Sequence, residues 1–408
     1  MELKELVARL KKAAKDLDIE PFELSTRQAN EAGVSDRQMR KYGGMNVIKK
    51  AYLPFEGKDL AKILKVKSEA NYISKLEKQI GNQANLEEVM KETLRKVKPV
   101  TIKPYKANKK QKIERAVNLV LSDLHIGSDI KANRTGHLNF GRVEEARRLA
   151  RITQEVLDYK PQYRAQTKLN VMLMGDLVQN QLHDARDGAP MSEQVVRAIN
   201  LLGQQMAHFV NSFPEVNVVV NYGNHSRRTS RHHGRAVNDK WDNYELIIAY
   251  ALKEMFRQHK NVTFTIPMTP FVTYEVFGSK IFASHGDSVL NVGYPGSSIN
   301  TKSLEGQINK INSTLPDKEE YSVFVVGHVH TASVTHLSNG AVMMTNGAMV
   351  PSDEYAVSIG LFENFCGQYM FESVKGYPVG DCRFIRVSKV DDQNKELDKI
   401  IKPFDELK

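Results

Sequence analysis

The chain has 408 residues, which allows two to three domains, and 41% of them are hydrophobic, which is enough for a sizeable core. No apolar run approaches the roughly 18 residues that a membrane helix needs, so we expect no membrane partner. The two cysteines, Cys366 and Cys382, exclude a disulfide framework and a zinc site built on cysteines. The amino terminus mixes both charge signs and shows no secretory signal, so a cytoplasmic location is expected.

The positive charge of the chain lies in its amino-terminal part. The net charge is +10, and residues 1–115 hold 27 Lys and Arg against 16 Asp and Glu, a balance of +11. The remaining residues hold 31 against 32, a balance of −1. A basic excess confined to one segment is typical of a part that binds nucleic acid, and a solvated helical surface is the alternative.

The first residues predict a small helical domain. Apolar positions at helical spacing predict a helix over 3–17. Two shorter helices follow, the first capped by Thr26 and ending at Gly33, the second capped by Ser35. This order fits a helix-turn-helix, and a helical cap without a ligand is the alternative. The second helix carries the side chains that would contact nucleic acid: Arg37, Gln38, Arg40 and Lys41.

A charged segment connects this domain to the rest. Residues 60–98 show heptad spacing for little more than two repeats, which is short for a coiled coil but would allow a homo-oligomer. A lysine-rich linker follows over 103–115. The predicted organisation is therefore a helical domain 1–55, a charged helical segment with a basic linker 56–115, a large domain 116–395 and a tail 396–408.

The large domain alternates strands with long helices. Strands are predicted at 116–123, 168–176 and 216–221, and helices at 141–158, 191–212 and 241–257. From residue 262 onward strands dominate, with hairpins turning at Gly278-Ser279 and Asn339-Gly340. The alternation predicts an α/β fold with helices on the faces of a sheet.

Five predicted strands, the three above and those that lead to His285 and His328, end in polar side chains. The side chains are Asp123 and His125, Asp176, Asn224 and His225, His285, and His328 and His330. Carboxyl ends of strands are where α/β sheets place ligand sites. Carboxylates, an amide and imidazoles without thiolates suit two divalent ions, Mn²⁺ first and Fe, Zn²⁺ or Mg²⁺ as alternatives. Two such ions clamp the oxygens of an in-line displacement at phosphorus.

The motif order D-x-H, G-D, G-N-H, H and G-H-x-H resembles the calcineurin-like metallophosphoesterases over about residues 116–350. The resemblance implies a four-layer αββα sandwich, and NGAMVPSDEYAV (346–357) is similar to phage-encoded members. It implies that one metal is held by Asp123, His125 and His330, that Asp176 bridges both, and that Asn224, His285 and His328 hold the other. It also implies that His225 protonates the leaving oxygen after attack by a hydroxide that bridges the metals.

The sequence departs from the family at two positions beside the catalytic histidine. Ser226 and Gln179 stand where members carry a carboxylate, and either side chain is a candidate to orient the ring of His225. The candidates for contact with the substrate come from the neighbouring loops: Arg227, Arg228, His183 and Asp184.

The metal motifs do not select the phosphoester. The basic amino terminus, of which AGVSDRQMRKYGGMNVIKKAYL resembles the helical repeat attached to homing endonucleases, favours a DNA-cleaving nuclease of phage or bacterial type. One alternative is a phosphomonoesterase or small-molecule phosphodiesterase in which this part only caps the site. Another is a DNA-binding accessory protein with a structural metal site.

Overall fold

The chain divides into two compact units, Met1–Lys91 and Glu92–Lys408, each with its own hydrophobic core. The computed structural model describes residues 3–21, 23–42, 45–46, 48, 100–103, 105–106, 111–180, 188–227, 240–316, 319–362, 365–388 and 396–404. The predicted heptad segment 60–98 lies outside the described residues.

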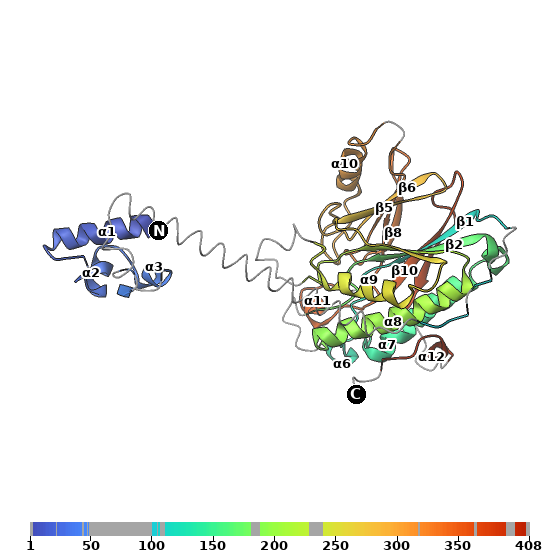
Figure 1. Cartoon of the computed structure of the whole chain (residues 1–408), viewed down its shortest axis with the longest axis horizontal. Coiled ribbons are helices and arrows are strands. Elements are labelled where there is room, and N and C mark those ends of the chain that lie inside the picture. Colours follow the sequence, from blue (N-terminus) through green and yellow to red (C-terminus); the bar gives the residue numbers. More distant parts are fainter. Residues whose placement is uncertain are drawn as a thin grey trace. The chain divides into compact units, whose positions relative to one another are not determined.

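The described part of the amino-terminal unit contains the helices α1 (Leu3–Asp16), α2 (Thr26–Glu31) and α3 (Asp36–Arg40), as Figure 1 shows in blue. Apolar side chains of these helices and of the residues between and after them form one small core, which includes Leu6, Leu10, Leu24, Met39 and Ile48. Helices this short owe their stability to such packing rather than to propensity.

The predicted cap of α2 was wrong by one residue. The hydroxyl of Ser25, not that of Thr26, accepts a hydrogen bond from the backbone N–H of Gln28 at 3.2 Å. The side-chain oxygen of Gln28 in turn accepts from the backbone N–H of Ser25 at 2.8 Å. This capping box needs Glu or Gln three residues after the cap, and Thr26 has Ala29 in that place.

The predicted cap of α3, Ser35, is confirmed, with Gln38 as its capping-box partner. The side-chain oxygen of Gln38 accepts from the backbone N–H of Ser35 at 2.8 Å, so it is engaged within the helix. Arg37, Arg40 and Lys41 are exposed. Contact of these side chains with nucleic acid stays a prediction.

The larger unit contains a six-stranded sheet in the order β11-β10-β1-β2-β3-β4. The strands are β1 (Arg115–Leu121), β2 (Thr167–Met174), β3 (Val216–Asn221), β4 (Val262–Thr265), β10 (Gly367–Val374) and β11 (Cys382–Arg386). Strands β1 to β4 run parallel, and β10 and β11 are antiparallel to their neighbours. Because the carboxyl ends of parallel strands share one edge, the loops after β1, β2 and β3 meet there.

A second sheet has five strands in the order β5-β6-β7-β9-β8. They are β5 (Phe271–Val276), β6 (Ser279–Ser284), β7 (Val323–Val326), β8 (Ser333–His336) and β9 (Val342–Thr345). Both predicted hairpins are confirmed. The first turns one residue earlier than predicted, at Phe277-Gly278, where φ of +50° and +87° matches a turn that favours the twist of a hairpin.

The two sheets and their helices form four layers. Helices α7 (Arg142–Asp158), α8 (Met191–Ser212) and α9 (Tyr244–Met255) cover the outer face of the first sheet, and α10 (Thr301–Asn312) covers that of the second (Figure 1). Between the sheets lies an apolar layer to which both contribute, for example Val120, Met172, Ala283 and Val325. The expected αββα sandwich with an all-α segment before it is confirmed.

Short elements complete the unit: α6 (Ala132–Thr135), the 3-10 helix η1 (Pro161–Gln166), α11 (Glu354–Ser358) and α12 (Leu397–Ile400). The predicted tail is anchored, because Leu397 and Ile401 are buried in the helix-side core and Asp398 pairs with Arg147 at 3.1 Å. Within the described ranges, no helix combines the length and the apolar character that a membrane crossing requires.

Candidate metal centre

Five loops bring the predicted ligands to one edge of the two sheets. Each loop follows the carboxyl end of a strand: β1, β2, β3, β6 or β7. Five of the residues sit in the left-handed region that non-glycine residues rarely adopt, namely Asp123, His125, Asp176, His328 and His330, with φ between +46° and +67°. Such backbone costs about 1–3 kcal/mol per residue and concentrates at functional sites, so the surrounding structure must hold it.

The first group consists of Asp123, His125 and His330, whose ligand atoms all lie within 4.8 Å of one another. Nε2 of His330 is 3.4 Å from Oδ1 of Asp123. Nδ1 of His125 lies 2.6 Å from the side-chain oxygen of Gln179, to which it donates. Among the residues that the structure describes, the buried Nε2 of His125 finds no hydrogen-bond partner. A neutral imidazole held in this tautomer offers its free lone pair, which is the form that a divalent ion requires.

The second group consists of Asp176, His285 and His328, again within 4.8 Å. Nε2 of His285 lies 3.0 Å from Oδ2 of Asp176 and 3.2 Å from Oδ1 of Asn224, so the amide oxygen belongs to the same cluster. Nδ1 of His285 lies 2.8 Å from the backbone carbonyl of Met174 and fixes the ring. Such a contact directs Nε2 toward a metal.

Glycines let the loops approach this closely. A Cβ on Gly223 would overlap the carboxylate of Asp176, and one on Gly327 would lie 2.5 Å from Oδ2 of Asp123. The glycines of the G-N-H and G-H-x-H motifs are therefore required by the space beside the two carboxylates.

Each of the two carboxylates is paired with a histidine. Burial raises the pKa of Asp123, but the hydrogen bond and charge of His330 outweigh it and lower that pKa to about 2. Burial lowers the pKa of His285, but the nearby Asp176 outweighs it and raises that pKa to about 9. In the metal-free protein the carboxylates are thus ionised and His285 is protonated at neutral pH.

Two other imidazoles are neutral at neutral pH. Burial and then the charge of His225 lower the pKa of His125 to about 3. Burial and then the charge of His285 lower the pKa of His328 to about 4. Neutral imidazole is the ligating form, so the donor set fits divalent cations.

His225 lies beside the two groups and is oriented by a backbone group. Its Nδ1 is 2.9 Å from the carbonyl of Gln179. Neither side chain that the sequence suggested does this: the amide of Gln179 faces His125, and the hydroxyl of Ser226 donates to Glu245 at 2.6 Å. The backbone carbonyl of Gln179 can reach the ring because the residues after Asp176 run alongside the loop after β3. Asn180 holds the two segments together by donating to the carbonyl of His225 at 2.6 Å.

Glu245, in the first turn of α9, connects the loops after β2 and β3. Its fully buried carboxylate accepts from the backbone N–H of Leu177 at 2.7 Å, the backbone N–H of Gly223 at 2.8 Å and the hydroxyl of Ser226. Burial, followed by the charge of Asp176, raises its pKa to about 7. Nothing in the sequence marks Glu245 as part of the site, because a glutamate in the first turn of a helix is an ordinary helix signal.

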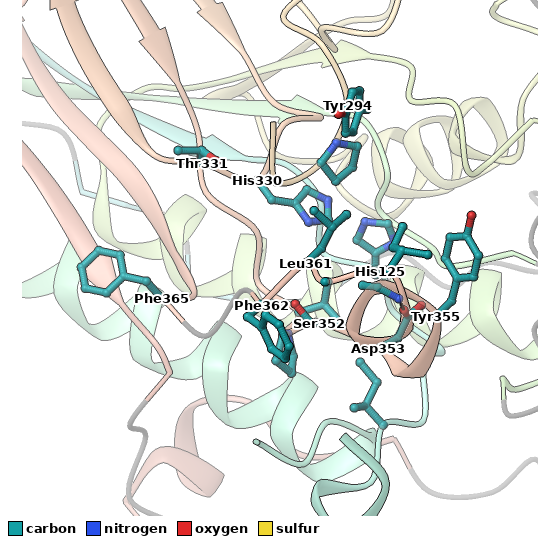
Figure 2. A pocket seen from close by; sticks show the side chains of 18 of the residues that line it. His125, Tyr294, His330, Thr331, Ser352, Asp353, Tyr355, Leu361, Phe362 and Phe365 are labelled. Atoms are coloured by element: carbon teal, nitrogen blue, oxygen red, sulfur yellow. Dashed lines mark hydrogen bonds between the residues drawn. The ribbon is translucent and has the colours of Figure 1, made fainter. Parts of the chain in front are cut away.

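A cavity of about 700 Å³ lies against His125, His225, His330 and Gln179. Most of its other lining is apolar: Tyr294, Pro295, Val350, Pro351, Tyr355, Ile359, Leu361, Phe362 and Phe365. Figure 2 labels Tyr294, Tyr355, Leu361, Phe362 and Phe365 among them. Among the described residues no Lys or Arg lines it. Arg227, a predicted substrate contact, is half-buried and absent from this lining, because its backbone pairs with Asn243 beside α9. The other candidates, Arg228, His183 and Asp184, lie outside the described residues.

No protein-family model and no curated protein matches the chain. Solved structures resemble it. A conserved uncharacterised protein from Streptococcus pneumoniae, described as a predicted phosphoesterase, is 13% identical over 67% of this chain and 98% of its own, with a TM-score of 0.27. The calcineurin-like phosphoesterase YfkN from Bacillus subtilis is 12% identical over 70% and 95%, with a TM-score of 0.32. Vps29 from Entamoeba histolytica, complexed with Zn²⁺, is 10% identical over 66% and 99%, with a TM-score of 0.24. Values this low transfer no function, so the assignment below rests on the residues of this chain.

The protonated His285 predicts that metal binding releases protons. The imidazole must lose its proton to bind a cation, so Mn²⁺ affinity should rise as pH approaches about 9, by roughly tenfold per pH unit below that value. Titration calorimetry at pH 7.5 in two buffers of different ionisation enthalpy should give a release of at least one proton. The exchange His285→Gln should lower that release by about one proton. No release by the wild-type protein would contradict the charge assignment.

Proposed function

We propose that this chain is a calcineurin-like metallophosphoesterase that hydrolyses phosphodiester bonds with two divalent cations. The observation that supports it most is the arrangement of two clusters of carboxylate and imidazole groups with one further histidine beside them. A further support is the buried Nε2 of His125, which has no hydrogen-bond partner among the described residues and so has a lone pair to offer a cation.

Each of the two clusters would hold one cation. Asp123, His125 and His330 would hold one cation, and Asn224, His285 and His328 the other. Asp176, which contacts His285 and the backbone N–H of His225, would be shared between them. When bound, the cations would supply Lewis acidity toward the phosphate and its attacking water.

His225 would transfer the proton to the leaving oxygen. Nδ1–H of His225 donates to the carbonyl of Gln179, so Nε2 is the atom that would carry the proton given to the leaving oxygen. The ring centroid of His225 lies 4.6 Å from that of His125, so it stands next to the first cluster. His225 also lines the cavity, which is where a substrate would enter.

DNA is the proposed substrate, and Mn²⁺ the proposed metal. Support for a polyanionic partner comes from the balance of +11 in residues 1–115 and from the exposed Arg37, Arg40 and Lys41. One observation favours a small phosphoester instead: no Lys or Arg in the described part of the cavity lining would follow a phosphate backbone.

The first test is Mn²⁺-dependent cleavage of end-labelled single- and double-stranded DNA by the full chain. Cleavage that depends on added metal supports a nuclease, and the product ladder separates exonuclease from endonuclease action. Hydrolysis of bis(p-nitrophenyl) phosphate without cleavage of any DNA would overturn the nuclease proposal and retain the phosphoesterase. Metal binding without either activity would favour the accessory DNA-binding protein.

The amino-terminal unit should contribute salt-dependent affinity for DNA. Replacing Arg37, Arg40 and Lys41 together by alanine should lower the slope of log affinity against log salt by roughly two to three, because each phosphate contact contributes about 0.9. Fluorescence anisotropy at several salt concentrations measures the slope. Alanine at Lys253, Arg257 and Lys260, exposed on and after α9, removes the same charge elsewhere and is the control. Equal slopes for the two triple variants would contradict a DNA-binding role for α3.

A further inference from the structure

Large apolar side chains on one side of the cavity are exposed to solvent, so they do not contribute to the core. Among the described residues eleven large apolar side chains are strongly exposed, and five of them line this one cavity. They are Tyr294, Tyr355, Ile359, Phe362 and Phe365, each between 54% and 66% exposed. Gathered around one hollow rather than scattered, such side chains mark a surface that binds a ligand. We call this set the aromatic wall.

The aromatic wall borders the imidazoles that would carry out the reaction. Figure 2 shows Tyr294, Tyr355 and Phe362 around the rings of His125 and His330. A phosphoester whose phosphorus lies at those imidazoles must place its organic part in the remainder of the same cavity. The wall is therefore positioned to contact the group next to the scissile phosphate.

Neighbouring side chains hold part of the wall in place. The ring of Phe365 stacks on that of Phe384, with centroids 5.0 Å apart and 12° between the planes. The guanidinium of Arg386 lies 4.6 Å from the centroid of Phe365. Phe362 meets the ring of His137 edge to face at 5.5 Å. Rings fixed in this way lose little conformational entropy when a flat ligand stacks on them.

The charged groups of the cavity lining indicate which kind of ligand the aromatic wall can bind. The one carboxylate of the described lining, Asp353, accepts from the backbone N–H of Ala356 as the cap of α11, and this lining has no Lys or Arg to contact a phosphate backbone. A neutral, flat group suits it better than a polyanion. Nucleobases stack on aromatic side chains regardless of sequence, and a base within a duplex has both faces already covered.

We infer that the aromatic wall binds an unpaired nucleobase next to the scissile phosphate, so that the enzyme acts on single-stranded DNA. This inference rests on the proposed nuclease function. A lipid diester is the competing occupant, but an acyl chain is flexible and aliphatic, whereas the exposed wall residues are mainly planar rings.

The test compares two single strands of equal length and charge, one of thymidines and one of stable abasic residues. The full chain with Mn²⁺ should cleave the thymidine strand with a kcat/KM about 10- to 100-fold higher, the range expected for one stacked base. It should also prefer the single strand to the same strand in a duplex. Phe362→Ala and Tyr355→Ala should slow cleavage of the thymidine strand toward the abasic rate and lower abasic cleavage much less. Phe362→Trp should restore the preference.

The control variant is Tyr377→Ala, which removes a ring that is 68% exposed but lies outside the cavity lining. Equal wild-type rates on the two single strands, or a duplex cleaved as fast as a single strand, would overturn the aromatic-wall inference and leave the nuclease proposal standing. Equal losses on both strands in the variants would show a structural role and overturn it too. Cleavage of no strand, with hydrolysis of a lysophospholipid or bis(p-nitrophenyl) phosphate, would overturn both proposals.

Discussion

Replacing His225 by alanine should lower kcat for an oligonucleotide by about 10²- to 10⁴-fold, the usual contribution of a general acid. The reason is that the leaving sugar oxygen is a poor leaving group and requires a proton. Because His225 belongs to neither cluster, the variant should still bind two Mn²⁺ ions, which titration calorimetry can count. The kinetic assay uses end-labelled single-stranded DNA under single-turnover conditions.

Two substrates with different leaving groups distinguish whether His225 acts as a general acid or only supports the structure. Bis(p-nitrophenyl) phosphate expels a stable phenolate, so its hydrolysis by His225→Ala should fall far less than cleavage of the oligonucleotide. His336→Ala, at an exposed position at the end of β8, is the matched control and should change neither rate. Equal losses on both substrates would contradict proton transfer by His225. Loss of bound Mn²⁺ would instead assign His225 to the metal centre.

Replacing Glu245 by alanine should lower the free energy of unfolding by about 3–5 kcal/mol. The exchange leaves the backbone N–H groups of Leu177 and Gly223 buried without an acceptor, each at a cost of about 1–3 kcal/mol, and also strands the hydroxyl of Ser226. Urea denaturation of the metal-free protein measures the loss as a lower midpoint at unchanged slope.

Two variants test this explanation for Glu245. In Glu245→Gln the amide oxygen still accepts a hydrogen bond, but the amide N–H faces one of the groups that donate to the carboxylate. This variant should therefore recover only part of the lost free energy of unfolding. Glu254→Ala, half-exposed on the same helix, should change stability by less than about 0.5 kcal/mol. A Glu245→Ala protein as stable as the wild type would show that the two loops hold their positions without this carboxylate.

Most of the fold could be predicted from the sequence. The apolar runs of β1, β2 and β3 are strong local signals because these strands are covered on both faces. The Asn339-Gly340 turn and the Ser35 cap are equally local. The cap of α2 was misplaced because serine and threonine are adjacent, and only the glutamine three residues later distinguishes them.

By itself the sequence determined which polar side chains follow the strand ends, and therefore which ones share an edge: parallel strands carry their carboxyl ends to the same place. Only the tertiary structure decided how that edge is held and what surrounds it. The carboxylate of Glu245 reaches the loops only because α9 packs against the first sheet, and the carbonyl of Gln179 orients His225 only because two loops run side by side. The aromatic wall brings Tyr294, in the loop between β6 and α10, to the same cavity as Tyr355 in α11 and Phe362 after it. These contacts join residues far apart in the chain, follow no helix or strand period, and arise from packing, which no local pattern records.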